Sequence, residues 1–155
     1  MSQVKNERTV VITRVFDAPR SRVFAAWTSA EHLAHWFGPK HFTVPSCEID
    51  PRPGGAFRVC MRSPAGHDFW VRGIFRELVV PERLVIACTA EGERGFARLE
   101  EVIDVKFAEQ DGKTRVTLHI TAAGATAEAA AMLEGMPKSW AQTVDRLNLH
   151  LVPKS

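Results

Sequence analysis

Tyrosine is absent from the sequence, so no phenol group is available to act as an acid or a base. Cysteine is scarce: Cys47, Cys60 and Cys88 are odd in number and far apart, and they form no C-x-x-C pair. Such cysteines suit reduced thiols better than a disulfide framework, and we therefore expect a cytoplasmic protein. The G-x-S-x-G turn that carries the nucleophile of many serine hydrolases is also missing, which argues against that class of enzyme.

Long runs of one residue type are missing as well. No apolar stretch approaches the roughly 20 residues of a membrane span, and the polar start of the chain lacks the apolar core of a signal peptide. No run rich in lysine and arginine occurs, and the formal net charge is +2. We therefore expect neither nucleic acid nor a membrane as a partner. The pair Gly54-Gly55 lacks the spacing of a phosphate loop, and we expect no cofactor.

The residues that are plentiful are those of an ordinary globular core. Hydrophobic residues make up 45% and charged residues 25% of the 155 positions, which is typical of a folded domain. A chain of this length buries about 70% of the surface of its unfolded form, so a core forms without disulfides. We expect one domain over residues 1–155, with its core between residues 9 and 151.

Most of the chain has the pattern of strands separated by turns. Runs rich in β-branched residues or alternating in polarity predict strands over residues 9–16, 42–50, 55–63, 67–79, 83–90, 96–109 and 113–122. The turn at Gln110-Asp111-Gly112 is a strong hairpin signal, because glycine tolerates the positive φ that such turns require. Alternation in the last two strands indicates an antiparallel meander with one wetter face. In the strand over 67–79 both faces are largely apolar, so the pattern leaves open which one faces inward.

Helical patterns lie on both sides of this meander. Pro19 suits the first turn of a short helix, with Asp17 or Ala18 as its N-cap. Ser29 predicts the start of a second short helix, which ends before Gly38.

The C-terminal segment predicts a long helix with one apolar stripe. The stripe consists of Ala129, Leu133, Met136, Trp140, Val144, Leu147 and Leu151. Thr126 is a suitable N-cap. Pro137 interrupts the pattern, and a proline inside a helix costs about 3 kcal/mol, so we expect a kink or a break there and a main helix from Pro137 to Leu151. A curved sheet and a single helix need not fill the space between them, which predicts a cavity.

These segments resemble a known family. The matching pieces are 16-FDAPRSRVFAAWT-28, 31-EHLAHWFGP-39, 49-IDPRPGGAFRVCM-61, 73-GIFRELVVPERLV-85, 112-GKTRVTLHI-120 and 140-WAQTVDRLNLHL-151. They are similar to the START-like, or SRPBCC, superfamily, and within it to the branch named for the C-terminal domain of activators of the ninety-kilodalton heat-shock protein ATPase. The resemblance implies an α+β helix-grip fold. In it, a curved seven-stranded antiparallel sheet packs around a long C-terminal helix, with two short helices between strands 1 and 2.

The resemblance also implies a deep, mostly apolar pocket. Relatives in the wider superfamily bind lipids, sterols, hormones or polyketides, and some are cyclases or dehydratases. The leading hypothesis is therefore the binding of a small hydrophobic molecule. The alternatives are an acid–base enzyme acting on a hydrophobic or polyketide-like substrate in the same pocket, and a module that binds a chaperone in a stress response. We expect a monomer or a homodimer, for which the edge strand 42–50 offers a pairing surface.

Large apolar side chains provide the candidates for the pocket wall. Ordinary core packing explains the same side chains, because apolar pockets and cores use the same residue types. The candidates are Trp36, Phe37, Phe57, Val59, Met61, Trp70, Phe75, Ile86, Cys88, Trp140 and Val144.

Ionisable side chains provide no pair that their spacing selects. The candidates for acid–base chemistry are Glu101, Asp104, His67, His119 and Arg72. His32 and His35 are three positions apart on the second short helix, but His41 lies beyond a Gly-Pro break. This set falls short of the ligands that a zinc site needs, so we expect no metal. Cys60 and Cys88 lie on predicted strands and are expected to be buried and unreactive.

Overall fold

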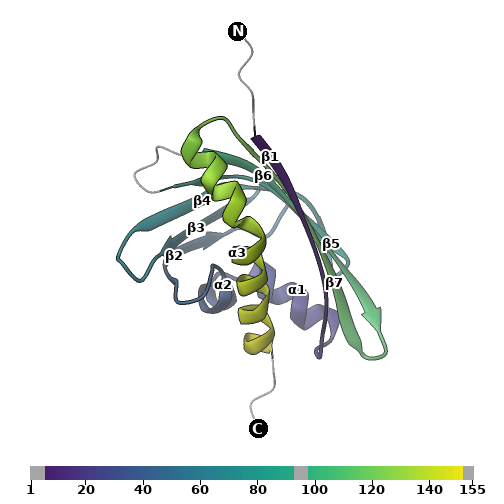
Figure 1. Ribbon diagram of the computed structural model, residues 1–155. Coiled ribbons are helices and arrows are strands. Elements are labelled where there is room, and N and C mark those ends of the chain that lie inside the picture. The colour runs from purple at the N-terminus through teal and green to yellow at the C-terminus, as the bar shows by residue number, and fades with distance from the viewer. Residues whose placement is uncertain (1–5, 93–97, 152–155) are drawn as a thin grey trace.

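The fold is an antiparallel sheet curved around one long helix (Figure 1). The structure, a computed structural model, describes residues 6–92 and 98–151. The strands in these ranges are β1 (Asn6–Phe16), β2 (Thr43–Ile49), β3 (Ala56–Arg62), β4 (Asp68–Val79), β5 (Arg83–Glu91), β6 (Arg98–Gln110) and β7 (Lys113–Gly124). They form one seven-stranded sheet in the order β1-β7-β6-β5-β4-β3-β2.

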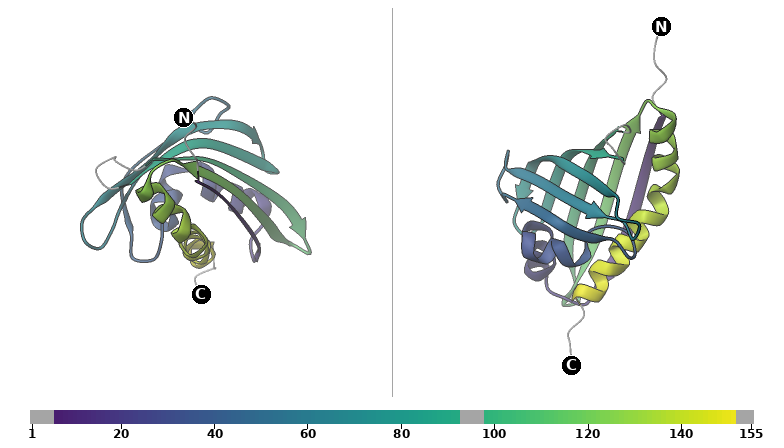
Figure 2. Two further views of the ribbon diagram at one scale, coloured as in Figure 1. Left: turned by 45° about the horizontal axis from the view of Figure 1, so that its top comes forward. Right: turned by 90° about the vertical axis from the view of Figure 1, so that its left-hand side faces the viewer.

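The helices lie on the concave side of this sheet. Between β1 and β2 the chain forms α1 (Arg20–Thr28) and α2 (Ala30–Trp36), and after β7 it forms α3 (Ala127–Leu151). Figure 2 shows the sheet arching over α3, with α1 and α2 together at one end of the arch. The predicted helix-grip fold is therefore confirmed. None of the described helices combines the length and apolar character that crossing a membrane requires.

The predicted hairpin between the last two strands is also confirmed. Gln110 pairs with Lys113, and the two residues between them, Asp111 and Gly112, have φ values of 51° and 78°. Positive φ at both central residues matches the twist of the flanking strands. The hairpin fixes a register in which Ile103 and Val105 lie opposite Ile120 and Leu118, and all four are buried in the core.

The register of β4 shows which of its apolar faces is internal. Val71 and Phe75 are buried, whereas Ile74 is 45% exposed. The ring of Trp70 lies on the face of Ile74, where the guanidinium carbon of Arg72 is 4.4 Å from its centroid. Up to Phe75 the inner face of β4 therefore carries the odd-numbered residues, and beyond the register shift between Phe75 and Glu77 it is Leu78 that packs against the core.

Of the kink or break predicted at Pro137, the break is absent, and the main helix begins at Ala127 rather than at Pro137. The helix α3 runs without interruption from Ala127 to Leu151 and contains Pro137, although its axis changes direction along the way (Figure 1). Leu133 and Met136, which precede the proline, are only 5% and 4% exposed. Burial of each such side chain contributes about 1.5–3 kcal/mol, which offsets the cost of about 3 kcal/mol for the proline.

Two of the three expected helix caps are confirmed. The N–H of Ala129 donates to Thr126 Oγ1 at 3.0 Å, and the N–H of His32 approaches Ser29 Oγ at 3.5 Å. At α1 the expectation is wrong, because Pro19 is the N-cap residue rather than Asp17 or Ala18.

The strand β1 is longer than its sequence pattern indicates. It begins at Asn6 because its polar first residues pair with the end of β7, from Asn6 opposite Gly124 onwards. Pairing with a neighbouring strand therefore overrides weak local propensity.

Candidate functional site

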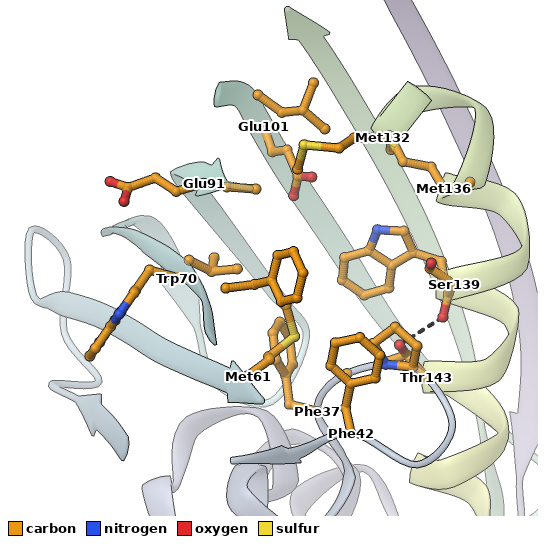
Figure 3. Close-up of a pocket in the computed structure, with 18 residues that line it drawn as sticks. Phe37, Phe42, Met61, Trp70, Glu91, Glu101, Met132, Met136, Ser139 and Thr143 are labelled. Carbon is orange, nitrogen blue, oxygen red and sulfur yellow. Dashed lines mark hydrogen bonds between the residues drawn. The ribbon is translucent and has the colours of Figure 1, made fainter. Parts of the chain in front are cut away.

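A cavity of about 260 Å³ separates part of the sheet from α3. Its wall comes from β3, β4, β5 and β6 on one side and from α3 on the other, and the segment 37–42 closes one end (Figure 3). Lining side chains that are apolar include Phe37, Phe42, Met61, Phe69, Val71, Leu99, Met132, Met136 and Trp140. The cavity is therefore mostly apolar, as expected for a site that binds a hydrophobic ligand.

Two pairs of aromatic rings in contact, one tilted and one edge to face, form the end of the cavity near residues 37–42. The rings of Phe42 and Phe69 have centroids 5.9 Å apart, and those of Phe37 and Trp140 are 6.1 Å apart. These distances are within the range of favourable aromatic pairs. The rings thus join β4, the segment 37–42 and α3 into one wall.

The segment 37–42 is fixed to α3 by polar contacts. The guanidinium of Arg146 donates to the carbonyl oxygens of Gly38 and Pro39 at 3.1 and 3.0 Å. The backbone N–H of Lys40 donates to Gln142 Oε1 at 3.1 Å. Burial lowers the pKa of Arg146, and the carbonyls that it binds compensate for part of its lost hydration.

Glu101 is the buried acid of the site. Its side chain is on the inner face of β6 and points into the cavity, on the side where α3 carries Met132 and Met136 (Figure 3). The residue is 8% exposed, and burial raises the pKa of its carboxyl to about 7. Among the residues that the structure describes, no hydrogen-bond or ion-pair partner of this carboxyl is found.

Small neighbours leave room around Glu101. It pairs across the sheet with Cys88 of β5 and Ala122 of β7, and Cys88 pairs in turn with Gly73 of β4. A Cβ on Gly73 would lie 2.0 Å from the carbonyl oxygen of Ala87, so this position admits no side chain. Among these four cross-strand neighbours, Glu101 therefore has the one long side chain, and those beside it are small.

Few other polar groups reach the cavity. The indole N–H of Trp140 has no hydrogen-bond partner among the described residues. The hydroxyl of Thr143 donates to the carbonyl of Ser139 at 2.8 Å. Glu91 borders the cavity but points away from it (Figure 3), and its carboxylate is paired with Arg72 at 3.3 Å. Within the described part of the chain, no lysine, arginine or histidine lines the cavity.

The structure brings only part of the predicted pocket set to this cavity. Phe37, Met61, Trp70 and Trp140 line it. The indole ring of Trp70 nevertheless points away from it (Figure 3).

The other predicted residues lie outside the cavity wall. These are Trp36, Phe57, Val59, Phe75, Ile86, Cys88 and Val144, all buried in the core. Trp36 is fully buried, and its indole N–H donates to the carbonyl of Ala26 at 3.0 Å. Phe57 lies between Phe37 and Phe75, with centroids 5.8 Å from each. These side chains form the packed layer next to the cavity and support it.

Several lining residues missed by the sequence prediction come from α3. Met132, Met136, Ser139 and Thr143 line the cavity. Their spacing of three and four residues indicates one face of a helix. The main helix was expected to begin at Pro137, however, which left Met132 and Met136 outside it. Phe42 and Phe69 were missed because they lie at the ends of strands, where alternation is hard to follow.

The remaining ionisable candidates lie away from the cavity. Asp104 pairs with Arg83 at 2.8 Å, which lowers the pKa of its carboxyl. His119 is opposite Asp104 in the register, on the outer face. His67 is in the exposed turn between β3 and β4. Of the acid–base candidates, Glu101 is therefore the residue that faces the cavity.

The histidines of α2 meet a residue that the sequence does not place near them. His32 Nδ1 lies 3.0 Å from His150 Nε2, and the ring of His35 stacks on that of His150 with centroids 5.5 Å apart. His41 is not part of these contacts. Among the described residues, no group of three side chains suited to holding a metal ion is found.

A curved sheet that grips a long helix over an apolar cavity defines the START-like class of proteins. The family model of the Activator of Hsp90 ATPase homolog 1-like protein matches residues 17–151. The chain therefore belongs to this family. No curated protein matches it.

Solved structures of bacterial proteins have the same fold. A protein from Chromobacterium violaceum is 26% identical with a TM-score of 0.78, over 94% of this chain and 98% of that one. A protein from Nitrosomonas europaea is 28% identical with a TM-score of 0.69, over 92% of this chain and 93% of that one. The AHSA1 protein from Silicibacter pomeroyi, at 19% identity, has a TM-score of 0.74 over 93% and 97% of the two chains.

Proposed function

We propose that this protein binds a small hydrophobic molecule in the cavity between the sheet and α3. The observation that carries the proposal is the cavity itself, about 260 Å³ in volume and lined by aromatic and methionine side chains. Ligand pockets usually have volumes of about 300–1,000 Å³. A ligand at the small end of that range is therefore the best fit.

The nature of the wall supports a ligand of adaptable shape. Met61 faces the cavity from β3, and Met132 and Met136 face it from α3. Methionine side chains have several rotatable bonds and a polarisable sulfur, so they fit themselves to different apolar shapes. A modest expansion of the cavity then requires only changes of rotamer.

Thermal melting and isothermal titration calorimetry with a panel of neutral apolar compounds test the proposal. A ligand present at about 100 times its dissociation constant stabilises the folded state by about 2.7 kcal/mol. We expect at least one compound in the panel to raise the melting temperature and to show saturable binding. Failure of every compound, with protein shown to carry no co-purified ligand, would contradict the proposal.

A matched pair of variants on one strand locates the binding. The Ala90→Leu change fills part of the cavity, because Ala90 is buried in its wall on β5. The Thr89→Leu change adds a similar side chain one residue away, on the outer face. Ala90→Leu is expected to weaken binding strongly and Thr89→Leu to leave it unchanged. Equal effects of the two would place the ligand elsewhere.

An acid–base enzyme acting in the same cavity is the second candidate, and Glu101 favours it. A carboxyl with a pKa of about 7 is suited to both give and take a proton near neutral pH. Mass spectrometry of ligands identified by the panel, after incubation with the protein, tests for turnover. A product that forms with the wild type and not with Glu101→Gln supports catalysis; unchanged ligand in both cases argues for binding alone.

A chaperone-binding surface has less support. The large apolar side chains that are exposed in the described residues are Val11, Val15, Ile74, Val79, Val80 and Leu149. They are spread over β1, β4, the turn after β4 and the last helix. Docking patches are contiguous, so we place the function in the cavity.

A further inference from the structure

The unpartnered carboxyl of Glu101 indicates what kind of ligand the cavity takes. We propose that the ligand is a hydrophobic amine, whose protonated nitrogen pairs with the Glu101 carboxylate while its apolar part fills the cavity. This inference rests on the proposed function, because it names the class of molecule bound at the same site. It starts from a polar group that is more than nine-tenths buried and points into an otherwise apolar space.

A buried charge needs a counter-charge or hydrogen bonds, and the described residues supply neither to Glu101. The carboxyl has no partner among the described residues, and the described residues that line the cavity include no lysine, arginine or histidine. Ionised groups buried in proteins are normally paired. An ammonium group on the ligand provides the missing partner.

The residues that face Glu101 from the neighbouring elements do not provide a partner for its carboxyl. On β5 the residue opposite is Cys88, whose thiol has its pKa raised by burial and by the Glu101 carboxylate. On β7 the residue opposite is Ala122. The helix α3 presents Met132 and Met136 to the same space.

Glu91 is the other acid at the edge of the cavity, and its charge is already balanced. Its carboxylate lies 3.3 Å from Arg72 and 3.9 Å from Arg98. Among the described residues, the charge left unbalanced at the cavity is therefore that of Glu101.

The aromatic wall favours the same ligand. Phe37, Phe42, Phe69 and Trp140 line the cavity. Faces of aromatic rings attract cations, and the attraction is stronger when the cation is removed from water. A carboxylate ligand such as a fatty acid would instead bring a second negative charge towards Glu101, and the described residues of the wall offer no cationic side chain to offset it.

A neutral ligand that accepts a hydrogen bond from protonated Glu101 is the competing arrangement, and pH separates the two. In the free protein the pKa of this carboxyl is about 7. The competing complex requires the protonated acid, so its affinity falls as the pH rises through 7. The amine complex requires the carboxylate, so its affinity rises between about pH 6 and 8, where alkyl amines remain protonated.

Isothermal titration calorimetry with matched compounds tests the proposal. The probes are three carbon skeletons, phenylbutyl, naphthylethyl and decyl, each as the amine, the alcohol and the carboxylate. At about pH 8 the amine of at least one skeleton is expected to bind at least about tenfold more tightly than its alcohol, the effect of a desolvated charge pair. The carboxylates are expected to bind more weakly than the alcohols.

Two variants of neighbouring residues serve as test and control. Glu101→Gln keeps the shape and removes the charge, and it is expected to reduce the affinity of the amine to that of the alcohol while the alcohol is unaffected. Glu100→Gln removes a carboxylate from the outer face of the same strand and is expected to leave the preference for the amine intact. A preference that survives Glu101→Gln, or that Glu100→Gln reduces equally, would overturn the proposal.

The wild-type protein provides a test that needs no variant. Because burial raises the pKa of Glu101 to about 7, binding of an ammonium group near that pH is expected to release a fraction of a proton. Titrations in two buffers with different ionisation enthalpies measure this release.

The outcomes distinguish the two proposals. Alcohols that bind as tightly as the amines, or amines that bind without releasing protons, would sink the inference and leave the hydrophobic site in place. Absence of binding by every amine and alcohol, together with a silent neutral panel, would sink both.

Discussion

The space between the sheet and α3 is filled at one end and hollow at the other. At the filled end, α1 and α2 insert Trp27 and Trp36, which are both fully buried, with ring centroids 4.8 Å apart. At the hollow end, side chains from β3–β6 and α3 surround the cavity (Figure 3). The same curved sheet thus supports a packed core where the two short helices fill it and a cavity where they do not.

Truncation of an aromatic ring at each end provides the largest contrast. Trp36→Ala is expected to cost about 3–5 kcal/mol of unfolding free energy, because it leaves a void in a close-packed layer and removes the bond to Ala26. Phe42→Ala, at the half-buried end of the cavity, is expected to cost roughly half as much, since the ring already borders empty space. Urea denaturation of both variants measures this; equal costs would mean that the two ends are packed alike.

Neutralisation of Glu101 is expected to give the next largest change in unfolding free energy. Unlike the aromatic truncations, it is expected to stabilise the protein above about pH 7. The pKa of this carboxyl is raised from 4.5 to about 7 on folding. Its contribution to stability is therefore present below about pH 4.5 and is lost as the pH rises to about 7. A shift of this size corresponds to roughly 3 kcal/mol.

The Glu101→Gln variant tests this dependence. It is expected to be more stable than the wild type at pH 8 by about 2–3 kcal/mol, with the difference shrinking towards pH 4.5. Urea denaturation across this pH range measures the difference. A gap that is independent of pH would show that the carboxyl ionises freely in the folded protein and that the hollow end admits water around it.

Glycine-to-alanine changes give the smallest effect and probe local space directly. A Cβ on Gly135, exposed on α3 at the border of the cavity, meets no atom within 4 Å, whereas a Cβ on Gly124 lies 2.5 Å from that of Ala129. Gly135→Ala is expected to stabilise the protein by about 1 kcal/mol through helix propensity. Gly124→Ala is expected to destabilise it. Thermal melting measures both, and stabilisation by the two changes alike would contradict the packing described for Gly124.

Much of the fold was predictable, since it depends on patterns that the chain repeats many times. Alternation in β6 and β7 and the Asp111-Gly112 turn fix a long hairpin. The apolar stripe of the last helix indicates that this helix packs against the sheet. The break expected at Pro137 was wrong, because a local cost was weighed without the burial of Leu133 and Met136 on the preceding turns.

The site was less predictable, because a cavity depends on what is absent between elements. Trp36, Phe57 and Phe37 are all large aromatic residues, and the sequence does not distinguish them. In the structure the first two lie in the core, whereas Phe37 lines the cavity. The alternation of β6 placed Glu101 on the side of Ile103 and Val105. Whether its carboxyl finds a partner depends on which residues of β5, β7 and α3 face it. Those residues are known only once the strand register and the position of α3 are known.

The contacts of Arg146 and Gln142 have a mechanical consequence. They attach the segment 37–42 to α3, and the same helix carries Met132, Met136 and Trp140 on the cavity wall. Displacement of α3 relative to the sheet therefore moves one whole side of the cavity together with its end. We therefore expect the size of the cavity to change through movement of α3 together with the segment 37–42, rather than through movement of that segment alone.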